Sequence, residues 1–156
     1  MSTKAPTAGT TDGASDLDQR LIVHATTIVI NGRAALISGA AGSGKSALAL
    51  ELIALGAKLV ADDRTILEDI DGVLVARAPS PIQGMIEARG VGLLNVDTVP
   101  CGNVVLAINM DEEEQSRLPD LRYVTYLGHN IALQHKVNAP YFARAVYQLL
   151  THARRA

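Results

Sequence analysis

Residues 39–46 read GAAGSGKS and have the spacing G-x-x-x-x-G-K-S, which is typical of loops that bind nucleotide phosphates. Glycines let the backbone N–H groups of such a loop turn toward a phosphate. Lys45 would reach the β- and γ-phosphates, and the Ser46 hydroxyl would ligate Mg²⁺. The sequence therefore predicts a phosphate-binding loop made of Gly39, Ala40, Ala41, Gly42, Ser43, Gly44, Lys45 and Ser46.

Two adjacent carboxylates, Asp62 and Asp63, come directly after the apolar run 57–61. In an open α/β sheet the carboxyl ends of the strands border the nucleotide crevice, so both acids are candidates for chemistry there. Neighbouring residues on a strand point to opposite faces. We therefore expect one acid to ligate Mg²⁺ and the other to accept a proton.

Glu87 and Arg89 in the segment IEARGVG are two residues apart, which places them on one face of a strand. Phosphoryl transfer needs an acid that holds Mg²⁺ and a cation that neutralises the oxygens of the transferred group. The pair fits both needs, although an isolated Glu-x-Arg pattern is more often a surface ion pair.

Other polar residues give weaker signals. His24 lies inside an apolar strand-like run, where a histidine is more often a core or edge residue than a catalytic one. Arg117 in SRLPD is more often a solvated charge. His129, His135 and His152 have no metal-ligand spacing with any partner, and we expect them at the surface.

The elements on both sides of the loop agree with a phosphate-binding role. Residues 34–38 form a short apolar run typical of a buried strand. Residues 45–55 lack glycine and proline and meet Gly56, which predicts a helix with a glycine C-cap. With a further strand at 57–61, they predict a βαβ unit with a right-handed crossover.

Two dipeptides predict β-hairpins: Asn31-Gly32 after the strand-like run 21–30, and Asp71-Gly72 between 65–70 and 73–77. The rest of the chain is predicted to contain a loop at 78–84, extended segments at 85–88 and 91–96, a strand at 104–109, an acidic helical turn or loop at 110–120, short strands at 123–126 and 131–135 paired around 128–130, and a helix at 139–153.

Composition excludes several classes of protein. The 156 residues suffice for one domain, and a net charge of −2 gives no basic surface for nucleic acid. No apolar run approaches the ~18 residues of a membrane span, and no signal peptide is visible, so we expect a cytoplasmic protein. The single cysteine excludes an internal disulfide and a cysteine-based zinc site. Residues 1–16 predict a disordered tail, which leaves residues 17–156 for the phosphate-binding domain.

Two segments, 22–63 and 82–96, resemble the catalytic domain of HPr kinase/phosphorylase. In that family a histidine lies one strand before the phosphate loop, the strand after the loop's helix ends in Ala-Asp-Asp, and a Glu-x-Arg-Gly-x-Gly signature follows. All three features occur here in that order. The resemblance implies that residues 17–156 form a P-loop kinase domain, which is an α/β P-loop nucleotide-binding domain with a mixed sheet and β-hairpins.

The resemblance also implies roles for individual residues. Lys45 would bind the phosphates, Ser46 and Glu87 would hold Mg²⁺, with Asp62 as a further candidate ligand, and Asp63 would be the general base. His24 and Arg89 would support the active site, and Arg117 resembles the arginine of the family's later catalytic segment.

By resemblance, the protein would transfer a phosphoryl group from ATP to a serine of HPr or of its nitrogen-branch paralogue, which are small phosphocarrier proteins, and would form a homo-oligomer. Ala25 and Ala47 depart from a glycine and an acidic residue of the family. Segment 126–137 replaces the arginine-rich Pro-Gly-Arg loop used for the reverse reaction, which predicts weak or absent phosphorylase activity. Two alternatives stay open: a small-metabolite kinase, for which the chain leaves little room for an acceptor domain and a lid, and a nucleotide-sensing module that binds without transfer.

Overall fold

The computed structural model describes residues 20–80 and 84–155. The predicted tail, residues 1–16, and residues 81–83 of the predicted loop lie outside these ranges. The described residues form a mixed nine-stranded sheet, a separate two-stranded sheet and two helices. Neither described helix is long and apolar enough to cross a membrane.

Near one edge of the large sheet lies the hairpin of β2 (Ala25–Ile30) and β3 (Arg33–Ser38), whose strands pair antiparallel. Asn31 and Gly32 connect them with φ angles of 52° and 78°, which confirms the predicted turn. On the far side of β3, the long strand β9 (Cys101–Glu113) pairs parallel.

The helix α1 (Lys45–Ala54) follows β3 and leads to β4 (Lys58–Ala61). β4 pairs antiparallel with β2, so β3 and β4 run in the same direction with β2 between them. The predicted βαβ unit is therefore present, and its crossover skips one strand. Gly56, with φ 113°, follows the helix as predicted, and its N–H donates to Ile53 O at 3.0 Å.

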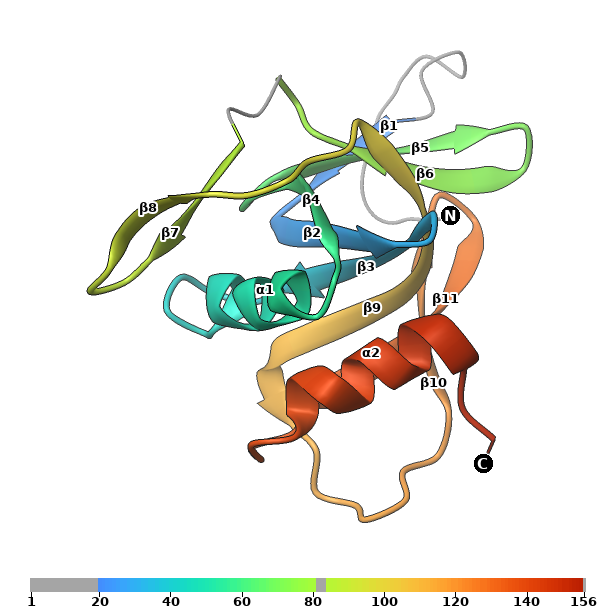
Figure 1. Ribbon diagram of the computed structural model, residues 1–156. Coiled ribbons are helices and arrows are strands. Elements are labelled where there is room, and N and C mark those ends of the chain that lie inside the picture. The colour runs from blue at the N-terminus through green and yellow to red at the C-terminus, as the bar shows by residue number, and fades with distance from the viewer. Residues whose placement is uncertain (1–19, 81–83, 156) are drawn as a thin grey trace.

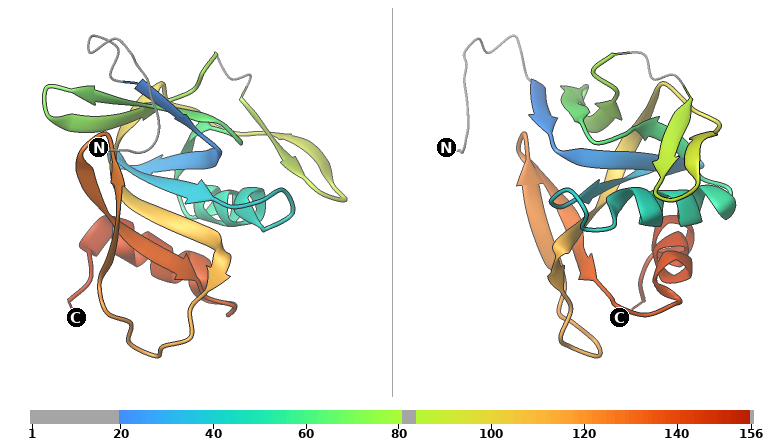
Figure 2. Two further views of the ribbon diagram at one scale, coloured as in Figure 1. Left: turned by 180° about the vertical axis from the view of Figure 1, so that it is seen from behind. Right: turned by 90° about the vertical axis from the view of Figure 1, so that its left-hand side faces the viewer.

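The inner strands β2 and β3 are mostly apolar, because both of their faces are covered. α1 and α2 (Phe142–His152) lie on one face, as Figures 1 and 2 show. This first core includes Ile28, Ile37, Leu48, Leu52, Ile108, Val146 and Leu150. The outer strands fold over the other face, where the second core includes Val29, Leu36, Leu67, Leu74, Ala76 and Ile131.

These outer strands join the sheet through β9, on the edge of β9 that faces away from β3. β1 (Arg20–Val23), β5 (Thr65–Ile70) and β6 (Val73–Arg77) follow one another antiparallel, and β6 pairs with the start of β9. β11 (His129–Lys136) pairs parallel with β9 and antiparallel with β10 (Arg122–Tyr126). β7 (Met85–Ala88) and β8 (Gly92–Asn95) form their own sheet, which projects beside α1 in Figure 1.

Four predicted boundaries need correction. The run 21–30 is two strands, because β1 pairs with β5 whereas β2 pairs with β3 and β4, and His24 is the bend between them. The predicted turn or loop from 110 begins only after Glu113, since β11 keeps that stretch paired as a strand. The last hairpin turns at Leu127 and Gly128, with φ angles of 49° and 81°, instead of at 128–130. The last helix is shorter than 139–153.

Candidate active site

The glycine-rich loop, residues 39–46, leaves the carboxyl end of β3 and enters α1. Gly39, Gly42 and Gly44 have φ angles of 146°, 83° and 105°, a region in which a side chain is strained. At Gly39 space is also lacking, because an added Cβ would lie 2.6 Å from Ser43 Oγ. The glycine spacing found in the sequence is therefore what this backbone path requires.

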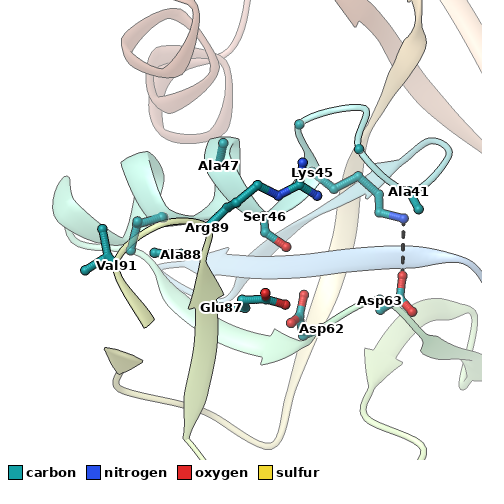
Figure 3. Close-up of a pocket in the computed structure, with 13 residues that line it drawn as sticks. Ala41, Lys45, Ser46, Ala47, Asp62, Asp63, Glu87, Ala88, Arg89 and Val91 are labelled. Atoms are coloured by element: carbon teal, nitrogen blue, oxygen red, sulfur yellow. Dashed lines mark hydrogen bonds and ion pairs between the residues drawn. The ribbon is translucent and has the colours of Figure 1, made fainter. Parts of the chain in front are cut away.

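Lys45 begins α1, and its side chain is only 7% exposed. Its Nζ donates to Gly39 O at 2.8 Å, across the loop, and to Asp63 Oδ1 at 3.3 Å, which Figure 3 shows as a dashed line. A buried ammonium needs such partners to offset its lost hydration. The lysine therefore connects the loop to the acidic end of β4.

Asp62 and Asp63 both line one pocket with the loop, contrary to the expectation that adjacent acids point to opposite faces. The reason is local: β4 ends at Ala61, and Asp63 adopts a left-handed backbone conformation with φ 68°. Strand alternation no longer applies there. Both carboxylates therefore reach the same space (Figure 3).

Thr26 holds these two acids from the neighbouring strand β2. Its side chain is fully buried, its Oγ1 donates to Asp62 Oδ1 at 3.0 Å, and it accepts the backbone N–H of Asp63 at 3.1 Å. Thr26 is not among the site residues predicted from the sequence. Only the pairing of β2 with β4 brings it to the acids, and a threonine in an apolar strand gives no local sign of that role.

Glu87 and Arg89 reach the pocket from the β7–β8 hairpin. Ile86 is 1% exposed and belongs to the core beneath α1, so Glu87 next to it on the strand points away from that core. In Figure 3 the Glu87 carboxylate points toward Asp62, with the Ser46 hydroxyl close by, and the Arg89 side chain reaches across the start of α1.

The pocket has a volume of about 730 Å³. Residues from the loop and α1, from the end of β4 and from the β7–β8 hairpin line it: Ala41, Gly42, Gly44, Lys45, Ser46, Ala47, Leu50, Asp62, Asp63, Glu87, Ala88, Arg89 and Val91. The fold therefore brings together three segments that are distant in the sequence.

Two predicted supporting residues, His24 and Arg117, are not among the described residues that line the pocket. His24 is at the bend between β1 and β2, with a side chain 77% exposed, so it is not the core residue that its apolar surroundings suggest. Its Nδ1 is 3.9 Å from Asp63 Oδ1, at the edge of the site. Arg117 is exposed between β9 and β10 and is not among the described residues that line the pocket.

Three members of the predicted loop do not line the pocket: Gly39, Ala40 and Ser43. The Ala40 N–H donates to both carboxylate oxygens of Asp111, at 3.0 and 3.2 Å. Asp111 lies two residues after Asn109 on β9, and Asn109 Oδ1 accepts the Asp111 N–H at 2.9 Å. Asp111 is thus a second residue that sequence reasoning missed, and it ties the loop to β9.

The oxygen atoms in the pocket suit a hard cation. Ser46, Asp62 and Glu87 supply one hydroxyl and two carboxylates, the ligand types that Mg²⁺ prefers. In the described part of the chain no group of three or more His, Cys, Asp or Glu side chains could hold a metal ion. In protein sites an Mg²⁺ ion usually keeps several waters and binds substrate phosphates in addition to one or two carboxylates.

A family model described as HPr Serine kinase C-terminal domain matches residues 15–110 of the chain. The chain belongs to this HPr serine kinase domain family. The matched range contains the glycine-rich loop, the acids on β4 and the Glu87–Arg89 segment. It ends just before Asp111, so the β9 anchor of the loop lies beyond it.

Relatives and a solved structure agree with this membership. HPr kinase/phosphorylase of Clostridium beijerinckii is 44% identical over 77 residues, which are 49% of this chain and 26% of that protein. The protein of the same name from Halalkalibacterium halodurans is 36% identical over 114 residues, 68% of this chain and 37% of that protein. The chain therefore spans well under half the length of these curated relatives.

The solved structure of the Hpr(Ser) kinase/phosphatase from Coxiella burnetii matches with a TM-score of 0.69 and 27% sequence identity. The match covers 83% of this chain and 87% of that chain. The mixed α/β sheet described above is therefore the fold of this HPr serine kinase family.

Proposed function

We propose that this protein transfers the γ-phosphoryl group of ATP to a serine hydroxyl of HPr or of the nitrogen-branch HPr-like phosphocarrier. The observation that carries the proposal is the single pocket in which the loop lysine, three carboxylates and an arginine meet. Phosphoryl transfer needs positioning and charge neutralisation more than covalent chemistry, and these side chains can supply both. Membership of the family and the names of the relatives support HPr as the acceptor, and the nitrogen-branch carrier is included because it is a paralogue of HPr.

In this proposal the loop and Lys45 hold the β- and γ-phosphates. Ser46, Glu87 and Asp62 would hold Mg²⁺, which when bound neutralises charge on the phosphate oxygens. Asp63 accepts the proton of the serine hydroxyl as its oxygen bonds to the γ-phosphorus. The bond from that phosphorus to the bridging oxygen of ADP breaks, and Arg89 neutralises the transferred group.

We further propose that the reverse, phosphorolytic reaction is weak or absent. Segment 126–137 contains one lysine, Lys136, and no arginine. It runs from the last residue of β10 through β11, which pairs with β9, and none of its residues lines the pocket. A second anion beside a phosphoserine would need concentrated positive charge, which this segment does not supply.

The family resemblance is also our reason to propose a homo-oligomer, which light scattering would test.

The function itself is tested by incubating the protein with labelled ATP and Mg²⁺, with and without purified HPr. We expect HPr to gain one phosphoryl group on a serine, as mass spectrometry of the acceptor would record. Transfer to a small molecule would favour a metabolite kinase, whereas ATP binding without any transfer would favour a nucleotide sensor.

A further inference from the structure

The Thr26 hydroxyl is a fully buried polar group on β2 that forms hydrogen bonds with two neighbouring residues of the pocket, Asp62 and Asp63. β2 and β4 are in register at Thr27 and Ala61, so Thr26 stands opposite the point where β4 has ended and Asp62 and Asp63 begin. A hydroxyl has one proton to donate and lone pairs to accept. Thr26 uses both functions on the two acids: it donates to Asp62 Oδ1 and accepts from the Asp63 N–H.

We propose that Thr26 is a positioning residue that aligns both acids for phosphoryl transfer; this inference rests on the proposed function. Its two bonds act on different parts of the pair. The bond to Asp62 restrains the carboxylate itself and leaves the second oxygen of that group for a metal ion. The bond from Asp63 restrains only the backbone, so the Asp63 carboxylate keeps its freedom to meet Lys45 and a substrate hydroxyl.

The backbone bond matters because Asp63 is in the left-handed region, at φ 68°, where a residue other than glycine needs support from its surroundings. Without an acceptor at Thr26, the Asp63 N–H would lose its partner. The chain could then return to an extended path after Ala61, which would turn one of the two acids away from the pocket. Thr26 therefore accounts for both acids facing one site.

The neighbouring residue Thr27 provides a matched control. It is also fully buried on β2, and its Oγ1 lies 2.7 Å from Thr65 Oγ1, which donates to Ala25 O at 2.9 Å. Among the described residues, neither threonine of that pair forms a hydrogen bond with Asp62 or Asp63. Loss of either threonine hydroxyl should destabilise the same strand, whereas only loss of the Thr26 hydroxyl should disturb the acids.

The experiment compares Thr26→Val, Thr26→Ser and Thr27→Val in the full chain. For each variant, the thermal midpoint, the kinetics of transfer to HPr and the affinity for ATP with and without Mg²⁺ are measured. We expect both valine variants to lower the midpoint. Only Thr26→Val should lower kcat, by about 10- to 100-fold, and reduce the gain in ATP affinity that Mg²⁺ gives, with ATP affinity in its absence unchanged. Thr26→Ser should restore both.

Equal kcat and equal Mg²⁺ dependence in Thr26→Val and Thr27→Val would overturn the proposal. If Thr26→Val does not fold, Thr26→Cys takes its place, because a thiol is a weak donor and acceptor. Its kcat and Mg²⁺ dependence should then fall clearly below those of Thr26→Ser, and equality would reject the role. If the wild-type protein binds ATP without transferring phosphoryl, the proposed function fails, but the Mg²⁺ dependence of ATP binding still decides the role of Thr26.

Discussion

Lys45 is the residue whose removal tests the nucleotide site most directly. Lys45→Ala should abolish transfer and weaken ATP binding by roughly 10- to 100-fold, the range for losing a hydrogen bond to a charged group. Calorimetry with ATP and Mg²⁺ measures the affinity. Lys58→Ala, at an exposed lysine of β4, is the control and should bind ATP normally. Unchanged affinity in Lys45→Ala would remove the phosphate-binding role of the loop.

The two adjacent acids should differ in what they contribute, although both face the pocket. Asp63→Asn should lower kcat by roughly 10²–10⁴-fold and keep ATP binding, because it removes the proton acceptor and leaves the loop intact. Asp62→Asn should instead raise the Mg²⁺ concentration needed for half-maximal rate. Steady-state kinetics at several Mg²⁺ concentrations separates these effects. The reverse pattern would exchange the two roles, and full activity in both variants would contradict the kinase proposal.

At the scale of elements, the site depends on where two strands stop. β4 stops at Ala61 and lets Asp63 turn, and β7 stops at Ala88 and lets Arg89 reach toward α1. Within a strand, successive side chains alternate between the two faces, whereas a polar side chain just after the end of a strand is free of this restriction. The candidate catalytic groups are therefore carried by strand ends and turns that the two cores hold in place.

The far end of β9 is joined to β10 by an ion pair that gives a pH test of stability. Arg122 Nη1 donates to Glu114 Oε1 at 2.5 Å, and the Glu114 side chain is only 4% exposed. This arginine bond, helped by the backbone N–H of Ser116, lowers the pKa of Glu114 to about 2. A lowered carboxyl pKa means that the folded state favours the ionised form.

The stabilisation from Glu114 should therefore be complete above the pKa of an unfolded glutamate, about 4.3, and should be lost as pH falls toward 2. Glu114→Gln should lower the thermal midpoint at pH 7, and its deficit relative to wild type should shrink between about pH 4.5 and 2. Melting curves across that range measure this. The exposed Glu112→Gln is the control. A deficit that does not change with pH would mean that the charge of Glu114 does not stabilise the fold.

For the molecule as a whole, the direction of catalysis is a property that can be measured in one assay. When phosphorylated HPr is mixed with the protein and millimolar inorganic phosphate, we expect little or no release of pyrophosphate. The reason is the lack of arginine in segment 126–137. The forward reaction in the same buffer serves as the control. Release of pyrophosphate at a rate like that of the forward reaction would show that another part of the chain supplies the positive charge.

Local sequence signals predicted much of the fold, because hairpin dipeptides, apolar runs and the glycine after α1 act over a few residues. The glycine-rich loop and the two turns at Asn31 and Asp71 are of this kind. What could not be predicted depends on strand pairing between distant segments. Thr26, Asp111 and the extension of β9 to Glu113 acquire their roles only when β2 meets β4 or β9 meets β3 and β11.

The position of β9 also has a consequence for how the protein is made. Arg33 on β3 pairs with Asn103 on β9, and the Ala40 N–H donates to Asp111. The residues that hold the glycine-rich loop in place are therefore synthesised long after the loop itself. While the nascent chain emerges, β2, β3 and α1 can form early, but one edge of β3 stays open. Such long-range parallel pairing is slow compared with local contacts. We therefore expect the ability to bind nucleotide to be among the last properties that the growing chain acquires.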